Sequence, residues 1–165
     1  MQTDFSIRPL TLQDEPFLWE MLYHAIYVPE GHPAPPRSIL QEPDIAHYVR
    51  QWGQLPEDQG FVAVDQATGQ PVGAAWLRLF TLLDPGYGYV DDETPELSIA
   101  MLPDYRGQGL GSHLLNALLN EARQKYTAVS LSVSPGNPAE KLYQKLGFTM
   151  VYEDASSRTM LKRLK

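Results

Sequence analysis

The sequence contains no cysteine among its 165 residues. This absence excludes disulfide bonds, a thiolate nucleophile and cysteine metal ligands. No hydrophobic run reaches the roughly 18 residues that a membrane-spanning helix needs. The N-terminus carries Asp4 rather than the basic and apolar stretch of a signal peptide. We therefore expect a cytoplasmic protein without a membrane partner.

Positive charge is scarce, with 13 Lys and Arg residues against 20 Asp and Glu residues and a formal net charge of −7. A chain without a basic stripe cannot neutralise the phosphates of a nucleic acid, so we expect no nucleic-acid partner. The four histidines, His24, His32, His47 and His113, show no metal-ligand spacing with carboxylates. We therefore expect no metal site.

The length and the 43% hydrophobic content are typical of one globular domain over residues 1–165. Strand and helix patterns alternate along the chain, which predicts a mixed α/β fold. Strands are expected at 5–8, 61–65, 71–82, 96–101, 129–134, 149–153 and 158–162. Helices are expected near 16–25, 44–52, 110–122 and 138–146, with Asp44 capping the second and Gly147 ending the last. The proline-rich stretch 27–37 is expected to be irregular.

A glycine-rich segment, Arg106-Gly107-Gln108-Gly109-Leu110-Gly111, lies between an alternating strand pattern and an amphipathic helix pattern. Glycine has no Cβ, so the backbone N–H groups of such a segment can approach a ligand closely. The first turn of a helix adds unpaired N–H donors and positive dipole charge, which together bind phosphate. The segment is a candidate pyrophosphate cradle, and the alternative is a tight structural turn before a helix.

The spacing excludes two common phosphate loops. A P-loop needs Lys-Ser/Thr after its second glycine, whereas Ser112 and His113 follow here. A dinucleotide fingerprint would need glycine in place of Ser112. The segment instead resembles the Arg/Gln-x-x-Gly-x-Gly/Ala acyl-CoA loop of the GCN5-related N-acetyltransferase (GNAT) superfamily. Further similarities lie, in the family's order, at Ile7–Thr11, Glu96–Tyr105, Asn137–Ala139 and Leu142–Phe148.

The resemblance implies a fold and an activity. The family's fold is a central, mostly antiparallel mixed sheet of about seven strands flanked by about four helices, with strands four and five splayed around the cofactor. The implied activity is an N-acetyltransferase that moves the acetyl group of acetyl-CoA to a primary amine of a small molecule, peptide or protein. The amine attacks directly in a ternary complex. The family also allows a homodimer.

The resemblance further assigns roles to residues. Cofactor binding is implied for the loop and for three other groups of residues: Arg106, Gly107, Gln108, Gly109, Leu110, Gly111 and Ser112; the backbone of Ile99, Ala100 and Met101; Asn137; and Tyr143. The spacing of six residues from Asn137 to Tyr143 occurs in some relatives, whereas many have seven. Asn137 also suits the cap of the helix that follows it.

Acetyl transfer to an aliphatic amine, with a pKa of roughly 10.4, requires that a proton be removed at neutral pH. The resemblance places the base, direct or water-linked, at Glu96; the alternative is a solvated strand-end carboxylate, with Asp91, Asp92 or Glu93 acting through water. Tyr143 would donate a proton or hydrogen bond to the departing thiolate, and the alternative is a tyrosine packed for its area.

The sequence leaves four questions open. The glycine loop is equally consistent with a non-catalytic acyl-CoA-binding module, and the acyl group transferred is not specified. The acidic stretch 83–96, with five carboxylates and no Lys or Arg, is either a solvated loop or a means of attracting a cationic amine. The identity of the acceptor is not encoded in any motif.

Overall fold

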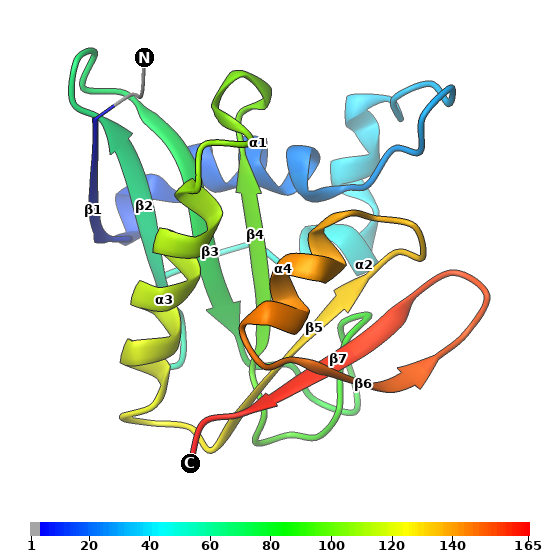
Figure 1. The fold of residues 1–165 in the computed structure, drawn as a ribbon. Helices are drawn as coiled ribbons and strands as arrows, with labels where there is room; N and C mark the ends of the chain where they lie inside the picture. The colour runs from blue at the N-terminus through cyan, green and yellow to red at the C-terminus, as the bar shows by residue number, and fades with distance from the viewer. Residues whose placement is uncertain (1–3) are drawn as a thin grey trace.

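A computed structural model describes residues 4–165 of the protein. Its centre is a seven-stranded sheet with the order β1-β2-β3-β4-β5-β7-β6 (Figure 1). The strands are β1 (Phe5–Pro9), β2 (Gln59–Asp65), β3 (Pro71–Arg78), β4 (Glu96–Met101), β5 (Ala128–Val133), β6 (Thr149–Glu153) and β7 (Arg158–Arg163). Every neighbouring pair is antiparallel except β4 and β5, which are parallel. The predicted fold class is thereby confirmed.

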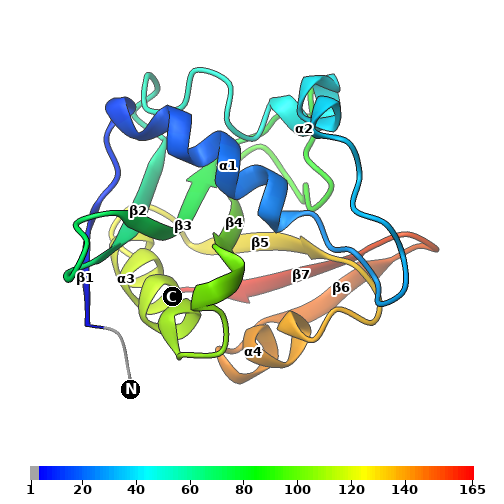
Figure 2. The ribbon, with the colours of Figure 1, turned by 90° about the horizontal axis from the view of Figure 1, so that it is seen from above.

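Two layers of helices cover the sheet (Figure 2). The α-helices described are α1 (Glu15–Ala25), α2 (Pro43–Ala46), α3 (Leu110–Ala122) and α4 (Ala139–Lys145), with 3₁₀ turns at Leu12–Asp14, Arg37–Gln41 and Pro103–Tyr105. α1 and α2 lie on one face of the sheet, and α3 and α4 lie on the other. Within residues 4–165, no helix has the length and apolar character needed to cross a membrane.

α3 forms because its apolar residues recur at helical spacing and face the sheet. The five residues predicted to share its buried face are all buried: Leu110, Leu114, Leu115, Leu118 and Ala122. These residues belong to one core cluster, and Leu97 of β4 packs in the same cluster. This packing fixes the N-terminus of α3, and therefore the glycine segment before it, relative to β4.

The prediction of a helix over 44–52 capped by Asp44 was wrong in the length of the helix and in its N-cap residue. α2 ends at Ala46, Glu42 rather than Asp44 is its N-cap residue, and the chain continues through turns in which Gln51 has a φ of 57°. The cause is Arg78, whose guanidinium donates to the backbone carbonyls of His47 and Arg50. A continuous α-helix over 44–52 would bond the His47 carbonyl to the N–H of residue 51, whereas the Arg50 carbonyl would lie in its last turn, without a partner in the helix. The strand expected to reach residue 82 ends at this same Arg78.

The parallel pair β4 and β5 diverges along its length. The two strands share a single register pair, Glu96 with Ser130, whereas β3 and β4 are paired from Arg78–Glu96 to Gly73–Met101. Beyond Glu96, the edge of β4 that faces β5 therefore has no strand partner among the described residues. The expected splay of the fourth and fifth strands is present, and it opens the sheet next to Glu96 (Figure 1).

Candidate functional site

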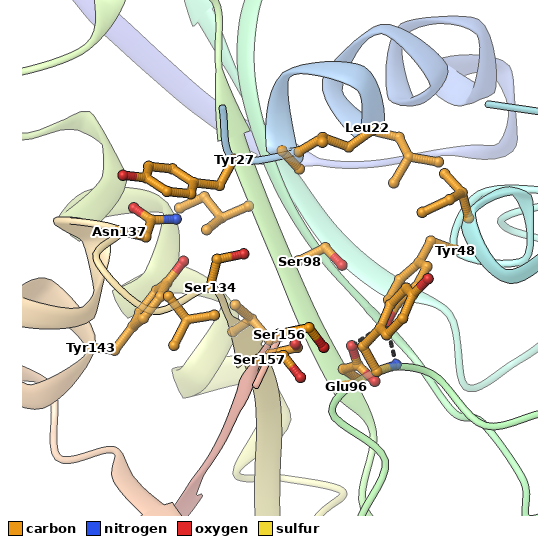
Figure 3. Close-up of a pocket in the computed structure, with 18 residues that line it drawn as sticks. Leu22, Tyr27, Tyr48, Glu96, Ser98, Ser134, Asn137, Tyr143, Ser156 and Ser157 are labelled. Carbon is orange, nitrogen blue, oxygen red and sulfur yellow. Dashed lines mark hydrogen bonds between the residues drawn. The ribbon is translucent and has the colours of Figure 1, made fainter. Parts of the chain in front are cut away.

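A cavity of about 300 Å³ occupies the opening between β4 and β5. Its walls come from the C-terminal end of α1, the diverging strands, α4, and the loops around Tyr48, Tyr87 and Ser157. Four of the residues singled out from the sequence line it: Glu96, Ile99, Asn137 and Tyr143. Figure 3 shows Glu96 at one end of the cavity and Tyr143 with Asn137 at the other. The fold thus brings together residues from distant parts of the chain.

Glu96 is a buried carboxylate with only 2% of its surface exposed. Its Oε2 accepts a hydrogen bond from the Tyr48 hydroxyl, and its Oε1 accepts one from the Gly88 N–H at 3.0 Å. Burial raises the pKa of Glu96 to about 7, although both hydrogen bonds favour the ionised form and act in the opposite direction. Glu96 is therefore not a solvated strand-end carboxylate, and it changes charge near neutral pH.

Tyr48 fixes the orientation of the Glu96 carboxylate. Its hydroxyl donates to Glu96 and accepts from the backbone N–H of Tyr87 at 2.8 Å, so both sides of the hydroxyl are bonded. Burial, with the nearby Glu96 charge, raises the pKa of Tyr48 well above its usual value. The hydroxyl consequently keeps its proton and remains a donor to Glu96.

Sequence reasoning missed Tyr48 and Gly88. Tyr48 lies in the turns that replaced the expected helix, and 48 residues separate it from Glu96. Gly88 leaves room for its segment to lie against β5, because a Cβ there would come within 2.6 Å of the Leu131 backbone. The signal that the sequence offers is the run Gly86-Tyr87-Gly88-Tyr89, in which two glycines alternate with tyrosines in the loop before the strand that starts at Glu96.

Tyr143 extends from α4 into the opposite end of the cavity (Figure 3). Its ring packs edge-on against Phe148, with 6.0 Å between the ring centroids. The residue is 8% exposed, and burial raises its pKa to about 12. Tyr143 is therefore neutral throughout the physiological range, with its hydroxyl proton in place.

Asn137 and Tyr27 shape the wall next to Tyr143. The Asn137 Oδ1 accepts a hydrogen bond from the Ala139 N–H at 3.0 Å, which forms an Asx turn before α4; the N-cap residue is Pro138, so the expected cap by Asn137 was wrong by one residue. The Tyr27 hydroxyl donates to the Gly136 carbonyl at 3.2 Å, across 109 residues of sequence. This bond ties the segment after α1 to the turn before α4, so it joins the two sides of the opening.

The glycine segment lies outside this cavity, at the start of α3. Gly107 and Gly109 have φ values of +76° and +80°, and a Cβ on either would meet no atom within 4 Å. The helix ladder begins with the His113 N–H bonded to the Gly109 carbonyl. The N–H groups of Leu110, Gly111 and Ser112 precede that bond and so have no partner within the helix. An anion would find free donors and open space here.

The remaining loop residues differ in role. Arg106 Nη2 donates to the His24 carbonyl and Gln108 Nε2 donates to the Asp104 carbonyl, each at 3.4 Å. Gly111 is buried, and a Cβ there would come within 3.4 Å of the Leu142 side chain. This is an ordinary van der Waals distance, so the space around Gly111 would accept a methyl group.

Ala100 and Met101 do not line the cavity with their side chains. Ala100 is buried in the core beneath α1, and Met101 packs partly buried against the core beneath α3. Their backbone, like that of Ile99, belongs to the stretch of β4 that β5 does not pair with. Main-chain donors and acceptors on this edge are therefore open to an extended ligand.

The acidic loop between β3 and β4 does not contribute a second carboxylate to the cavity lining. Asp84 accepts from His47 Nδ1 at 2.9 Å, Asp92 accepts from the Leu82 N–H at 3.0 Å, and Asp91 accepts from the Glu93 N–H at 2.9 Å. These carboxylates stabilise the loop itself. The described residues also include no cluster of three or more His, Asp or Glu that could hold a metal ion.

Comparisons with known proteins agree with this fold. Residues 19–148 match the sequence model of the "Acetyltransferase (GNAT) family". The chain is 31% identical over 150 residues to the glucosamine 6-phosphate N-acetyltransferase of Trypanosoma brucei brucei, covering 88% of this chain and 89% of that one. It is 39% identical over 61 residues to the [ribosomal protein bS18]-alanine N-acetyltransferase of Haemophilus influenzae, which covers 36% of this chain and 42% of that relative. The second match thus spans less than half of the relative.

A similar fold occurs in the protein yncA of Salmonella typhimurium, whose structure was solved with its cofactor acetyl-CoA. The TM-score is 0.68 at 21% identity, and the superposition covers 99% of this chain and 95% of that one. At this identity the likeness establishes the architecture alone.

Proposed function

The chain belongs to the acetyltransferase (GNAT) family, and from this premise we propose that it transfers the acetyl group of acetyl-CoA to a primary amine. The observation that carries the proposal is the single cavity that holds a buried carboxylate at one end and a buried neutral tyrosine at the other. These two groups suit the two proton-handling tasks of the reaction. One accepts a proton from the amine, and the other stabilises the departing thiolate.

Acetyl-CoA fits the groups that the chain leaves free. Its pyrophosphate would lie at the glycine segment, on the N–H groups of Gly107, Gln108, Gly109, Leu110, Gly111 and Ser112, with Arg106 beside it. Its pantetheine arm would bond the open edge of β4 at Ile99, Ala100 and Met101, as an added strand does. The thioester would then reach the cavity between Asn137 and Tyr143. In this arrangement the free edge of β4 leads from the loop to the site of transfer.

Glu96 is proposed as the base. The amine arrives as an ammonium ion and gives one proton to the Glu96 carboxylate, through a water because Glu96 is 2% exposed. The amine nitrogen then attacks the thioester carbonyl carbon, so that a C–N bond forms and the C–S bond breaks. The nitrogen loses its second proton, and the thiolate takes up a proton. The balance is an amide, a thiol and one released proton.

Tyr143 is proposed to act as a hydrogen-bond donor rather than as a full acid. An alkyl thiol has a pKa near 8.5, whereas the pKa of Tyr143 is about 12. Complete transfer of the phenolic proton to the thiolate would therefore be unfavourable. A hydrogen bond from the neutral phenol still stabilises the negative charge as it develops on sulfur.

A thiol-release assay tests the proposal. Because the chain has no cysteine, a thiol reagent reports only CoA, and mass spectrometry identifies the acetylated amine. The panel should include glucosamine 6-phosphate and an alanine-initiated peptide, since these are the acceptors named for the relatives. We expect acetyl-CoA-dependent thiol release with at least one amine.

Two other outcomes would change the assignment. Calorimetric binding of acetyl-CoA without thiol release across a broad amine panel would make the chain a non-catalytic acyl-CoA-binding module. Faster release from a different acyl-CoA, with the corresponding product mass, would make it a transferase of that acyl group.

A further inference from the structure

The part of the cavity near Glu96 contains no cation. Among the described residues that line the cavity there is no Lys, Arg or His, and Glu96 is the one carboxylate. The remaining polar groups are hydroxyls and one amide. A carboxylate or phosphate on an acceptor would therefore enter without an opposite charge to pair with, and it would lie close to Glu96.

The two arginines that bond carboxylates of the helices in the cavity wall, α1 and α4, are already engaged. Arg158, which follows the lining residue Ser157, donates to Glu140 at 2.7 Å and also to Glu153. Arg37, opposite α1, donates to Glu20 through two nitrogens. Releasing either arginine to bind an acceptor anion would break existing ion pairs. Neither is a ready partner for a negative charge.

Tyr48 and Tyr87 near Glu96, and Tyr27 at the Tyr143 end of the cavity, offer their rings rather than free hydroxyls. The Tyr27 hydroxyl donates to the Gly136 carbonyl, that of Tyr48 donates to Glu96, and that of Tyr87 donates to Asp44. Leu22, Ile26 and Ile45 complete this part of the wall. Aromatic faces and aliphatic side chains stabilise an apolar group, and aromatic faces also tolerate an ammonium ion.

The size of the cavity also limits the size of the acceptor. About 300 Å³ is at the small end of ligand pockets, and the acyl donor must share this space. On the basis of the proposed function, we propose that the acceptor is a small primary amine whose body is largely apolar and carries no anionic group. The body lies against Leu22, Ile45 and the tyrosine rings, and the amine points to Glu96.

The decisive comparison uses three amines that share a phenylethylamine core: 2-phenylethylamine, phenylalaninamide and phenylalanine. Phenylalaninamide and phenylalanine have nearly the same size and differ in charge. With each rate expressed per concentration of unprotonated amine, which removes the difference in basicity between the two amines, we expect kcat/KM for CoA release to be about a hundredfold lower with phenylalanine, because two like charges at cavity distances repel and no cation compensates. Equal or faster turnover of phenylalanine would overturn the inference.

A second series tests the apolar body. From ethylamine to butylamine, kcat/KM should rise about threefold to fourfold with each methylene that the cavity buries. A flat series would contradict an apolar acceptor end. Both outcomes are distinct from failure of the proposed function, in which none of these amines and none of the wider panel releases CoA from acetyl-CoA.

Discussion

At the scale of single residues, the buried Glu96 carboxylate links the protein's stability to pH. Its pKa is raised from 4.5 to about 7 in the folded state. Protonation of Glu96 therefore stabilises the fold fully below pH 4.5, and this stabilisation is lost as the pH rises through 7. Above that pH, the hydrogen bonds from the Tyr48 hydroxyl and the Gly88 N–H stabilise the ionised carboxylate.

We predict that Glu96→Gln removes this pH dependence. Between pH 5 and pH 8, the free energy of unfolding of the wild type should fall by about 3 kcal/mol more than that of the variant. Denaturant titrations of both proteins at the two pH values measure the difference. Parallel pH dependences would show instead that Glu96 titrates at its ordinary pKa in the folded protein.

Tyr143→Phe removes one hydroxyl and leaves the ring packed on Phe148. Turnover should decrease about tenfold to hundredfold, the range for losing a hydrogen bond to a charged group. The dissociation constant of acetyl-CoA, measured by calorimetry, should change little. Tyr126→Phe is a matched control, since Tyr126 is also buried and its hydroxyl lies 3.5 Å from the Glu57 carbonyl. Unchanged turnover in Tyr143→Phe would reduce Tyr143 to a packing residue.

Tyr48→Phe should act through Glu96. The hydroxyl of Tyr48 favours the ionised carboxylate, so its removal raises the pKa of Glu96 further above 7. The acidic limb of the rate–pH profile should then move to higher pH, whereas Tyr126→Phe should leave it in place. A Tyr48→Phe variant that loses rate equally at every pH would indicate that Tyr48 supports the fold without tuning Glu96.

At the scale of elements, the glycine segment and α3 were predictable because their signals are local. The apolar face of α3 is set by spacing alone, and the left-handed positions before it need glycine. The segment 44–52 was not predictable in the same way. Its apolar residues also fit a helix, but Arg78, far along the chain, bonds the His47 carbonyl that the helix would use.

Gly109→Ala tests the loop as the phosphate site. Gly69, in the turn between β2 and β3, is a matched control because its φ is +75° and a Cβ there also meets nothing within 4 Å. Both substitutions should cost a similar roughly 1 kcal/mol of stability, from alanine in a left-handed conformation. The affinity for acetyl-CoA should decrease about tenfold to hundredfold in Gly109→Ala alone. Equal affinities in the two variants would move the phosphate site elsewhere.

At the scale of the whole molecule, the site depends on the topology of the sheet. The splay of β4 and β5 and the family's motifs made the cavity's position and the residues Glu96, Asn137 and Tyr143 predictable. Tyr48 and Gly88 were not, because their contacts with Glu96 arise from loops that only the complete fold brings together. The same holds for the proposed acceptor end of the cavity, which is lined by side chains from α1, α2 and β4 rather than by one motif.

The central claim is that Glu96 accepts the amine proton within this cavity, and the dependence of kcat/KM on pH tests it most directly. With 2-phenylethylamine or the best acceptor of the panel, the wild-type rate should rise about tenfold per pH unit up to about 7 and then level off. In Glu96→Gln only the neutral amine can react, so the rate should continue to rise with pH toward the pKa of the amine, roughly 10. Superimposable profiles for the two proteins would contradict the claim.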